Sequence, residues 1–307
     1  MIPAGYEKHF PVMLNEVLTA MQPQDGETYV DATFGNGGYT EALLKAANCK
    51  VIALDRDPNV KIRAAELKAE YGDRFDFRAG QFGDFAKLVT EPVNGAVFDI
   101  GVSSMQLDNA DRGFSFGKDA PLDMRMSCSG LSAADLVNNM PEKELADLIY
   151  KYGEERKSRQ IAAKIIEARK TAPIATTKQL AELIYTVIHK TPNAIDPATR
   201  TFQALRIAVN NELEELEQGL EGAANRLAPR GRLVIVTFHS LEDRIVKTFF
   251  KENAGPNVHV SKYAKEVPEL GDDVIFAETS KAIAASEEET AVNKRSRSAK
   301  LRWGIKR

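Results

Sequence analysis

Short apolar runs alternate with helical patterns over the first hundred positions of the chain. Four runs predict buried strands, at residues 29–32, 51–54, 75–78 and 96–100. Segments with apolar residues at helical spacing, such as residues 40–47, separate these runs. Strands that alternate with helices are typical of a parallel sheet with right-handed crossovers. The sequence therefore predicts an α/β fold.

The chain returns to this sheet much later. A fifth apolar run covers residues 233–238. Directly before it, residues 197–227 predict one long amphipathic helix, which Pro229 and Gly231 end. Near the end of the chain, Leu301, Trp303 and Ile305 alternate with polar residues and predict a further strand with one buried face. The basic outward side chains of this strand are candidates to lie beside a phosphate backbone.

The segment between the fourth and fifth strands predicts an inserted helical subdomain. Residues 112–126 form a long polar and aromatic loop without periodicity, and such loops are usually functional or disordered. Helical patterns follow, with Ser132 as one cap and Thr176 or Thr177 as another. The pattern at residues 154–170 has a basic face: Arg156, Lys157, Arg159, Lys164, Arg169 and Lys170.

The loop after the first predicted strand is rich in glycine. Gly35, Gly37 and Gly38 precede a helical pattern, and the second strand ends on Asp55. Glycines let a backbone approach a ligand closely, and the first N–H groups of a helix are open to it. A carboxylate at the end of the next strand can accept hydrogen bonds from ribose hydroxyls. This unit predicts a site for a nucleoside cofactor.

The residues of this unit favour S-adenosylmethionine. A dinucleotide fingerprint needs glycine where this chain has Thr40, and no lysine follows the glycines as nucleotide hydrolases require. The first strand also carries Asp31, which suits an ammonium group better than a pyrophosphate. A dinucleotide, or a turn that binds no ligand, remains an alternative at this point.

Polar residues gather after the fourth predicted strand. Asp99, Ser103, Ser104 and Gln106 fall where the ligand of an open α/β sheet lies. We interpret Asp99, Ser103 and Ser104 as candidate acceptors for the group that reacts. Phe82, after the third strand, is placed to lie against an adenine ring.

The fifth predicted strand ends on a second polar cluster. His239 and Ser240 are adjacent there, but adjacent residues on an extended chain point to opposite faces, and no G-x-S-x-G elbow is present. This disfavours a serine hydrolase. His239 remains a candidate site residue.

Composition narrows the class of protein. The 307 residues carry a net charge of −3, which argues against a general nucleic-acid binder, although the tail after Lys294 is basic. No apolar run approaches the roughly 18 residues of a membrane span. Cys49 and Cys128 form neither a disulfide framework nor a metal-ligand cluster. The N-terminus lacks a signal-peptide pattern, so we expect a cytoplasmic enzyme without a metal.

Seven segments are specific when taken together, and with them the chain resembles the RsmH (MraW) family of bacterial methyltransferases. The resemblance extends from residue 9 to residue 302. The segments are residues 33–38 (TFGNGG), 99–104 (DIGVSS), 112–116 (RGFSF), 121–126 (PLDMRM), 152–156 (YGEER), 197–206 (PATRTFQALR) and 238–244 (FHSLEDR).

The resemblance implies a Rossmann-like class I methyltransferase domain, residues 1–108 and 198–307, with an inserted substrate-recognition subdomain at 109–197. It implies methyl transfer from S-adenosylmethionine to the N4 amine of a cytidine in the decoding region (P site) of 16S ribosomal RNA, within the small ribosomal subunit. DNA and membranes are not expected partners. The family's cofactor contacts map onto these residues: Gly37, Gly38, Tyr39, Asp55, Phe82, Asp99 and Gln106.

Two positions depart from the family pattern. Tyr39 stands where a histidine is common, and Asn293 is followed by lysine and not by proline. One rival hypothesis is a non-enzymatic RNA-binding ribosome assembly factor, which the complete set of cofactor residues disfavours. Another is an NAD-dependent oxidoreductase, which Thr40 disfavours. A methyltransferase that acts on another RNA is a further alternative.

Overall fold

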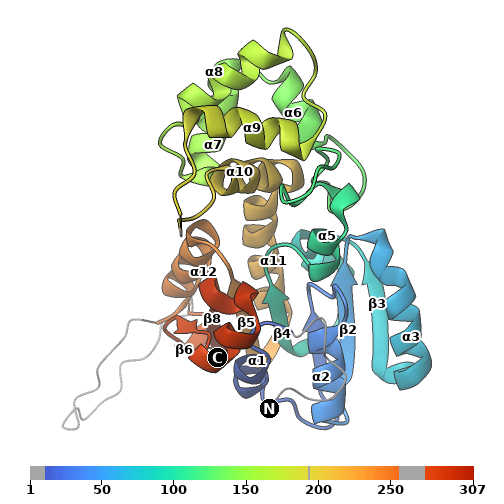
Figure 1. The fold of residues 1–307 in the computed structure, drawn as a ribbon. Coiled ribbons are helices and arrows are strands. Elements are labelled where there is room, and N and C mark those ends of the chain that lie inside the picture. The colour runs from blue at the N-terminus through green and yellow to red at the C-terminus, as the bar shows by residue number, and fades with distance from the viewer. Residues whose placement is uncertain (1–10, 193, 256–273) are drawn as a thin grey trace, which may run out of the picture. The chain divides into compact units, whose positions relative to one another are not determined.

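The computed structural model describes residues 11–192, 194–255 and 274–307, so His9, where the resemblance begins, lies outside the described residues. The described chain divides into two compact units (Figure 1). The first combines residues from 1–101 and 213–307, and the second is residues 102–212. The sequence placed the boundaries at 108/109 and 197/198. They differ because the helix after residue 197 contributes Phe202 and Leu205 to the core of the second unit.

The first unit is built on one sheet, whose strand order is β3-β2-β1-β4-β5-β8-β6, with β7 paired to β8. The first five strands are parallel, and β8 runs antiparallel to β5, β6 and β7. This arrangement confirms the expected Rossmann-like class. The strands are β1 (Thr28–Asp31), β2 (Lys50–Asp55), β3 (Phe75–Ala79), β4 (Val93–Asp99), β5 (Leu227–Thr237), β6 (Phe276–Thr279), β7 (Ile283–Ala284) and β8 (Lys300–Lys306).

Helices cover the sheet on both faces. Buried residues of α4 (Phe85–Leu88), α11 (Glu212–Arg226) and α12 (Ser240–Asn253) share one core with the strands. Helices α1 (Leu14–Met21), α2 (Gly38–Ala46) and α3 (Lys61–Tyr71) also contact the strands. The methyl group of Met21 on α1 lies where a side chain at Gly95 of β4 would point. The first unit also has a short helix, α13 (Glu287–Val292), and these 3-10 helices: η1 (Pro58–Val60), η2 (Gly72–Arg74), η3 (Phe82–Asp84) and η5 (Lys294–Ser298). Another 3-10 helix, η4 (Ala110–Arg112), lies in the second unit.

The prediction of one helix across residues 197–227 was wrong. Helix α10 (Ala198–Asn210) ends at Asn211, whose φ of 53° is left-handed, and α11 begins at the next residue. Asparagine tolerates this backbone conformation better than most residues. The preceding Asn210 is held by the backbone of the 112–126 loop, because its side chain donates to the carbonyl of Met124 and accepts from the N–H of Met126.

The second unit is helical apart from its loops, and its apolar faces meet in one core. Ser132 and Thr176 cap their helices as expected, each by accepting from the backbone N–H three residues later. The helices are α5 (Ser104–Asp108), α6 (Ala133–Asn139), α7 (Glu142–Gly153), α8 (Ser158–Arg169), α9 (Thr177–Val187) and α10.

The 112–126 loop is ordered through specific contacts. The Arg112 guanidinium donates to the carbonyls of Arg125 and Met126, both at 2.9 Å. The backbone N–H of Met124 donates to the carbonyl of Arg112 at 3.0 Å.

No helix among the described residues is both long enough and apolar enough to cross a membrane.

The basic tail forms the expected strand, but its side chains differ from expectation. Leu301 is buried, whereas Trp303 and Ile305 are only partly buried. Arg302 pairs with Asp243 at 2.8 Å, and Lys306 donates to two backbone carbonyls. These side chains hold β8 in the sheet, so they do not support the sequence hypothesis of a strand that lies along a phosphate backbone.

Candidate cofactor and substrate site

The glycine turn lies between β1 and α2 and is organised by Asp31. Gly37, the N-cap of α2, has a φ of +76°, a conformation that favours glycine. The buried Asp31 carboxylate accepts from the N–H of Thr33 at 3.2 Å and from the N–H and hydroxyl of Thr40 at 3.1 and 2.7 Å. Thr40 therefore has a structural function at the position where a dinucleotide fingerprint has glycine. Asp31 shapes the turn and is fully buried, so it presents no open acceptor.

Asp55 ends β2 and is oriented by the same turn. Its carboxylate accepts from the N–H of Gly35 at 2.7 Å and from the N–H of Asp57 at 2.8 Å. A carboxylate has about four acceptor positions, so two bonds leave capacity for ribose hydroxyls. Burial raises the pKa of Asp55 to about 6. The two N–H groups act in the opposite direction, because they stabilise the ionised carboxylate and so lower the pKa.

Replacing Asp55 with alanine is expected to weaken S-adenosylmethionine binding by about 1–3 kcal/mol, because buried ribose hydroxyls lose a charged acceptor. Isothermal calorimetry measures this loss. Asp73→Ala, at a fully exposed acid in the same unit, is the matched control. Unchanged affinity in Asp55→Ala would remove Asp55 from the site.

The affinity is also expected to fall in acid. With a pKa of about 6, Asp55 is ionised above that pH and protonated below it. Binding should therefore weaken as the pH falls from about 7.5 to about 5, because the protonated carboxyl is a poorer acceptor. Calorimetry across this range should show a smaller pH effect in Asp55→Ala than in the wild type.

Asp99 ends β4, next to β1 and β5. Its backbone N–H donates to the hydroxyl of Thr33 at 2.7 Å, which ties it to the start of the glycine turn. Its Oδ1 atom is inaccessible to solvent and has no hydrogen-bond partner among the described residues. Burial, followed by the charges of Asp31 and Glu242, raises the pKa of Asp99 well above its ordinary value. Such a group favours a cationic ligand or a hydrogen-bond donor.

Tyr39 and Phe82 are more buried than a purely ligand-binding role requires. Tyr39 is 4% exposed, and its hydroxyl donates to the carbonyl of Val12. A cofactor contact at this position is therefore expected through the backbone. Phe82 packs edge-to-face against Phe98, with ring centroids 5.8 Å apart, and only part of it is available to an adenine ring.

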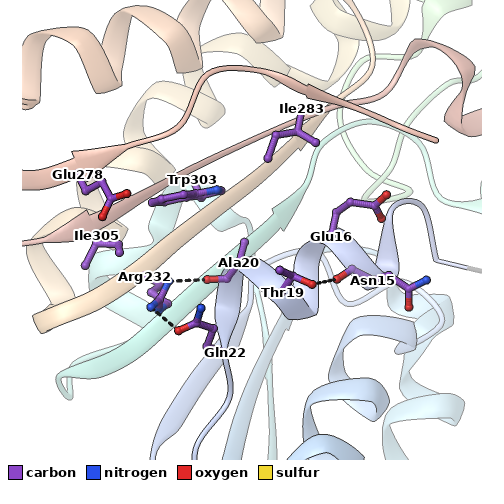
Figure 2. Close-up of a pocket in the computed structure, with 10 residues that line it drawn as sticks. All are labelled: Asn15, Glu16, Thr19, Ala20, Gln22, Arg232, Glu278, Ile283, Trp303 and Ile305. Atoms are coloured by element: carbon purple, nitrogen blue, oxygen red, sulfur yellow. Dashed lines mark hydrogen bonds between the residues drawn. The ribbon is translucent and has the colours of Figure 1, made fainter. Parts of the chain in front are cut away.

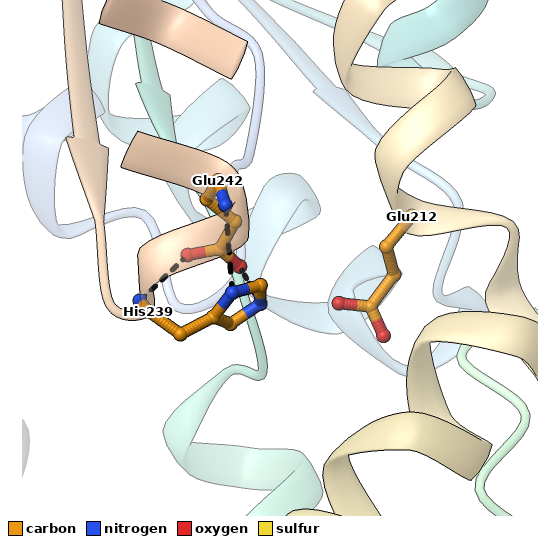
Figure 3. Close-up of side chains that lie close together, drawn as sticks. All are labelled: Glu212, His239 and Glu242. Atoms are coloured by element: carbon orange, nitrogen blue, oxygen red, sulfur yellow. Dashed lines mark hydrogen bonds and ion pairs between the residues drawn. The ribbon is translucent and has the colours of Figure 1, made fainter. Parts of the chain in front are cut away.

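His239 and Glu242 form a reciprocal cap at the start of α12 (Figure 3). Nδ1 of His239 accepts from the N–H of Glu242 at 3.4 Å, and the Glu242 carboxylate accepts from the N–H groups of Phe238 and His239 at 2.7 and 3.1 Å. Nε2 of His239 lies 2.8 Å from Oε1 of Glu242. Sequence reasoning missed the fully buried Glu242, although the spacing of a capping pair, i and i+3, was visible.

Ser103, Ser104 and Gln106 lie in the second unit, at the start of α5. The Ser103 hydroxyl accepts from the N–H of Gln106 at 3.2 Å, and the Gln106 side chain accepts from the N–H of Ser103 at 3.0 Å. Ser104 is the first residue of the helix. Ser103 and Gln106 thus stabilise the helix start. The cofactor contact that the resemblance implies for Gln106 stays a prediction, as do the acceptor functions predicted for Ser103 and Ser104.

Three aromatic side chains in the segments that carry the family resemblance, Phe114, Phe116 and Phe238, differ in how free they are to stack on a base. Phe114 is buried beneath the Arg112 guanidinium, and Phe116 packs on Phe202 with ring centroids 4.9 Å apart. Phe238 follows β5, is partly exposed, and lies 3.5 Å from the position of a Cβ atom built on Gly101. Phe238 is therefore the best placed of the three for a base platform.

The basic face of the helical unit is only partly available. Arg169 donates to the carbonyls of Val137 and Met140, Lys157 donates to the carbonyl of Val187, and Lys164 pairs with Glu167. These contacts are internal to the unit. Three further bases of the face are exposed, namely Arg156, Arg159 and Lys170.

An open groove of about 570 Å³ lies beside α1 (Figure 2). Glu16, Arg232 and Trp303 are among its lining residues. Arg232 lies on β5, where it pairs with Ile305 of β8. It is four residues nearer the amino end of β5 than Val236, which pairs with Asp99 of β4. The groove is therefore separate from the carboxyl edge of the sheet, where Asp55, Asp99 and His239 lie.

Comparisons with known proteins agree with the resemblance. Two curated proteins named "Ribosomal RNA small subunit methyltransferase H" align over 298 residues and 96% of this chain. The protein from Rickettsia massiliae is 57% identical, with 97% of its length covered, and that from Rickettsia bellii is 56% identical, with 98% covered. A solved rRNA methylase from Streptococcus thermophilus aligns with a TM-score of 0.40 and 11% identity, over 95% of this chain and 93% of that one. A sequence model of the MraW methylase family matches residues 6–307. The chain belongs to the MraW methylase family.

Proposed function

We propose that this protein transfers a methyl group from S-adenosylmethionine to the N4 amine of a cytidine in 16S ribosomal RNA, at the decoding region (P site) of the small subunit. The family and the names of the Rickettsia relatives support an rRNA substrate. One observation supports the proposed chemistry: the Oδ1 atom of Asp99 is buried and has no hydrogen-bond partner among the described residues. An unmatched buried acceptor is costly, and a donor on a bound ligand would remove that cost.

The residues around the glycine turn fit the cofactor. Asp55 is available to ribose hydroxyls, and the acids near Asp99 favour a positively charged ligand. When bound, S-adenosylmethionine supplies a methyl group made electrophilic by its sulfonium. A dinucleotide fits less well, because its pyrophosphate would be repelled by Asp99, on which the charge of Asp31 also acts.

The chain must make a weak nucleophile reactive. The lone pair of the cytosine amine is delocalised into the ring, so an acceptor that holds an N–H group can turn the lone pair toward the methyl group. Asp99 is our first candidate for this acceptor, with Ser103 and Ser104 as alternatives. No strong base is needed before transfer, because the amine proton becomes acidic once nitrogen is alkylated. Orientation of this kind can contribute up to roughly 7–11 kcal/mol.

The base must leave its stack to reach this site. Phe238 is the proposed platform for it. The exposed bases Arg156, Arg159 and Lys170 are proposed to contact phosphates of 16S RNA within the small subunit. We accordingly propose a cytoplasmic location.

Two experiments test the function. Calorimetry with S-adenosylmethionine and with NAD separates a methyltransferase from an oxidoreductase and from an assembly factor that binds neither. Mass mapping of 16S RNA from cells that lack this protein should then show one cytidine without its N4 methyl group. Full methylation in those cells would overturn the proposal.

His239→Asn is expected to retain turnover within about tenfold of the wild type, because asparagine is also a good N-cap and His239 is proposed to position the substrate loop. Single-turnover methylation measures this. Complete loss of methyl transfer, with S-adenosylmethionine and RNA binding intact, would instead assign proton transfer to His239.

A further inference from the structure

Residues 11–13, which we call the strap, lie directly against the glycine turn. A Cβ atom on Gly38 would fall 2.2 Å from Cγ of Pro11, so the Pro11 ring occupies the space that only a glycine leaves open. The next residue of the strap is tied to the turn as well, because the Tyr39 hydroxyl donates to the carbonyl of Val12. The strap is thus one wall of the turn that is proposed to bind the cofactor.

The strap is held from its other side by a residue of α13. The backbone N–H of Met13 donates to Oε1 of Glu289 at 2.7 Å, across 276 positions of the chain. Met13 is the N-cap of α1 and has a left-handed φ of 53°, and its side chain makes no capping hydrogen bond. Glu289 therefore places a carboxylate at the start of α1, where unpaired N–H groups and the helix dipole favour negative charge.

The charge of Glu289 also acts on the proposed acceptor. Its charge is among those that raise the pKa values of Asp99 and Tyr39. Burial raises the pKa of Glu289 itself, while the N–H of Met13 favours its ionised form. A partly buried carboxylate of α13 is thus bonded to the strap, and its charge acts on Tyr39 of the turn and on the proposed acceptor.

We propose that Glu289 is a positioning residue for the cofactor: by holding the backbone of Met13, it keeps the strap against the glycine turn. The inference rests on the proposed binding of S-adenosylmethionine at that turn. It gives the short acidic helix α13 a function in cofactor affinity.

The test compares Glu289→Ala, Glu289→Gln and Glu288→Ala with the wild type. Calorimetry measures the Kd for S-adenosylmethionine and for its uncharged product, S-adenosylhomocysteine. Glu289→Ala should weaken both at least tenfold, whereas Glu289→Gln should retain affinity within about threefold, because an amide oxygen still accepts from Met13. Glu288→Ala, at an exposed acid of the same helix, should change neither. Glu289→Ala should also raise KM for S-adenosylmethionine by a larger factor than it changes kcat at saturation.

Each outcome decides the inference. If the wild type does not bind S-adenosylmethionine, the proposed function fails. If the wild type binds and Glu289→Ala binds equally well, the positioning function is overturned. If Glu289→Gln weakens the binding of S-adenosylmethionine and not that of S-adenosylhomocysteine, the charge of Glu289 acts on the ligand directly. The positioning function through the strap is then overturned. If Glu289→Ala does not fold, Tyr39→Phe removes the other tether of the strap and decides the question, because unchanged affinity there would overturn the inference.

Discussion

Replacing Asp99 with asparagine is expected to lower the rate of methyl transfer by about a hundredfold or more, the typical loss when an oriented electrostatic group is removed from an active site. The exchange keeps the size of the side chain but removes the negative charge. Single-turnover methylation at saturating S-adenosylmethionine separates this loss from weaker binding. Asp73→Asn is the control, at an exposed acid just before the amino end of β3 and so away from the carboxyl ends of the strands.

The state of Asp99 gives this prediction a second readout. Burial and the neighbouring acids raise the pKa of Asp99 in the protein without ligand. A cationic cofactor beside the carboxylate would favour its ionised form. We therefore expect S-adenosylmethionine to release a proton on binding, in an amount that Asp99→Asn reduces; calorimetry in buffers of different ionisation enthalpy measures it. A rate for Asp99→Asn within about threefold of the wild type would mean that the amine is held by another group.

Assembled small ribosomal subunits are expected to be methylated about a hundredfold faster than protein-free 16S RNA at limiting concentration. A protein of net charge −3 cannot rely on diffuse attraction to RNA, so its exposed bases must meet phosphates at fixed positions. Several such base–phosphate contacts formed at the same time raise the affinity for the RNA by about 10²–10⁴-fold. Initial rates on the two substrates, measured at several salt concentrations, test this.

Arg159→Glu should lower the rate on subunits and leave S-adenosylmethionine binding unchanged. Lys178→Glu, a charge reversal on α9 of the same unit, is the control. Lys164 is a weaker choice than the sequence suggested, because it already pairs with Glu167. Equal rates on subunits and on protein-free RNA would mean that the enzyme reads one local loop.

The parts of the fold with strong periodicity could be predicted from the sequence. Parallel strands, the glycine turn and the caps at Ser132 and Thr176 depend on local patterns, and the structure has them at those positions. The break at Asn211 could not be predicted, because the apolar spacing continues through it and only contacts of Asn210 with a distant loop mark it.

Some residues of the candidate site could likewise be predicted from the sequence, and others could not. Asp55 and Asp99 could be predicted because they end strands, and strand ends share an edge. Glu242 and Glu289 could not, because their importance depends on which backbone N–H groups they meet, His239 and Phe238 in one case and Met13 in the other. The reach of Glu289 across the chain leaves no trace in local spacing.

The insertion of residues 102–212 between β4 and β5 has a consequence for how the protein folds. These two strands pair along Gly95–Asp99 and Arg232–Val236, so the sheet must close a loop that contains the entire second unit. Closure of a long flexible loop is entropically unfavourable, and non-local strand pairing slows folding. The helical unit is continuous in sequence and rich in local contacts, which favours its early formation. Pairing of β4 with β5 would then be the late step, and until that step the apolar edge of β4 is exposed to association with other chains.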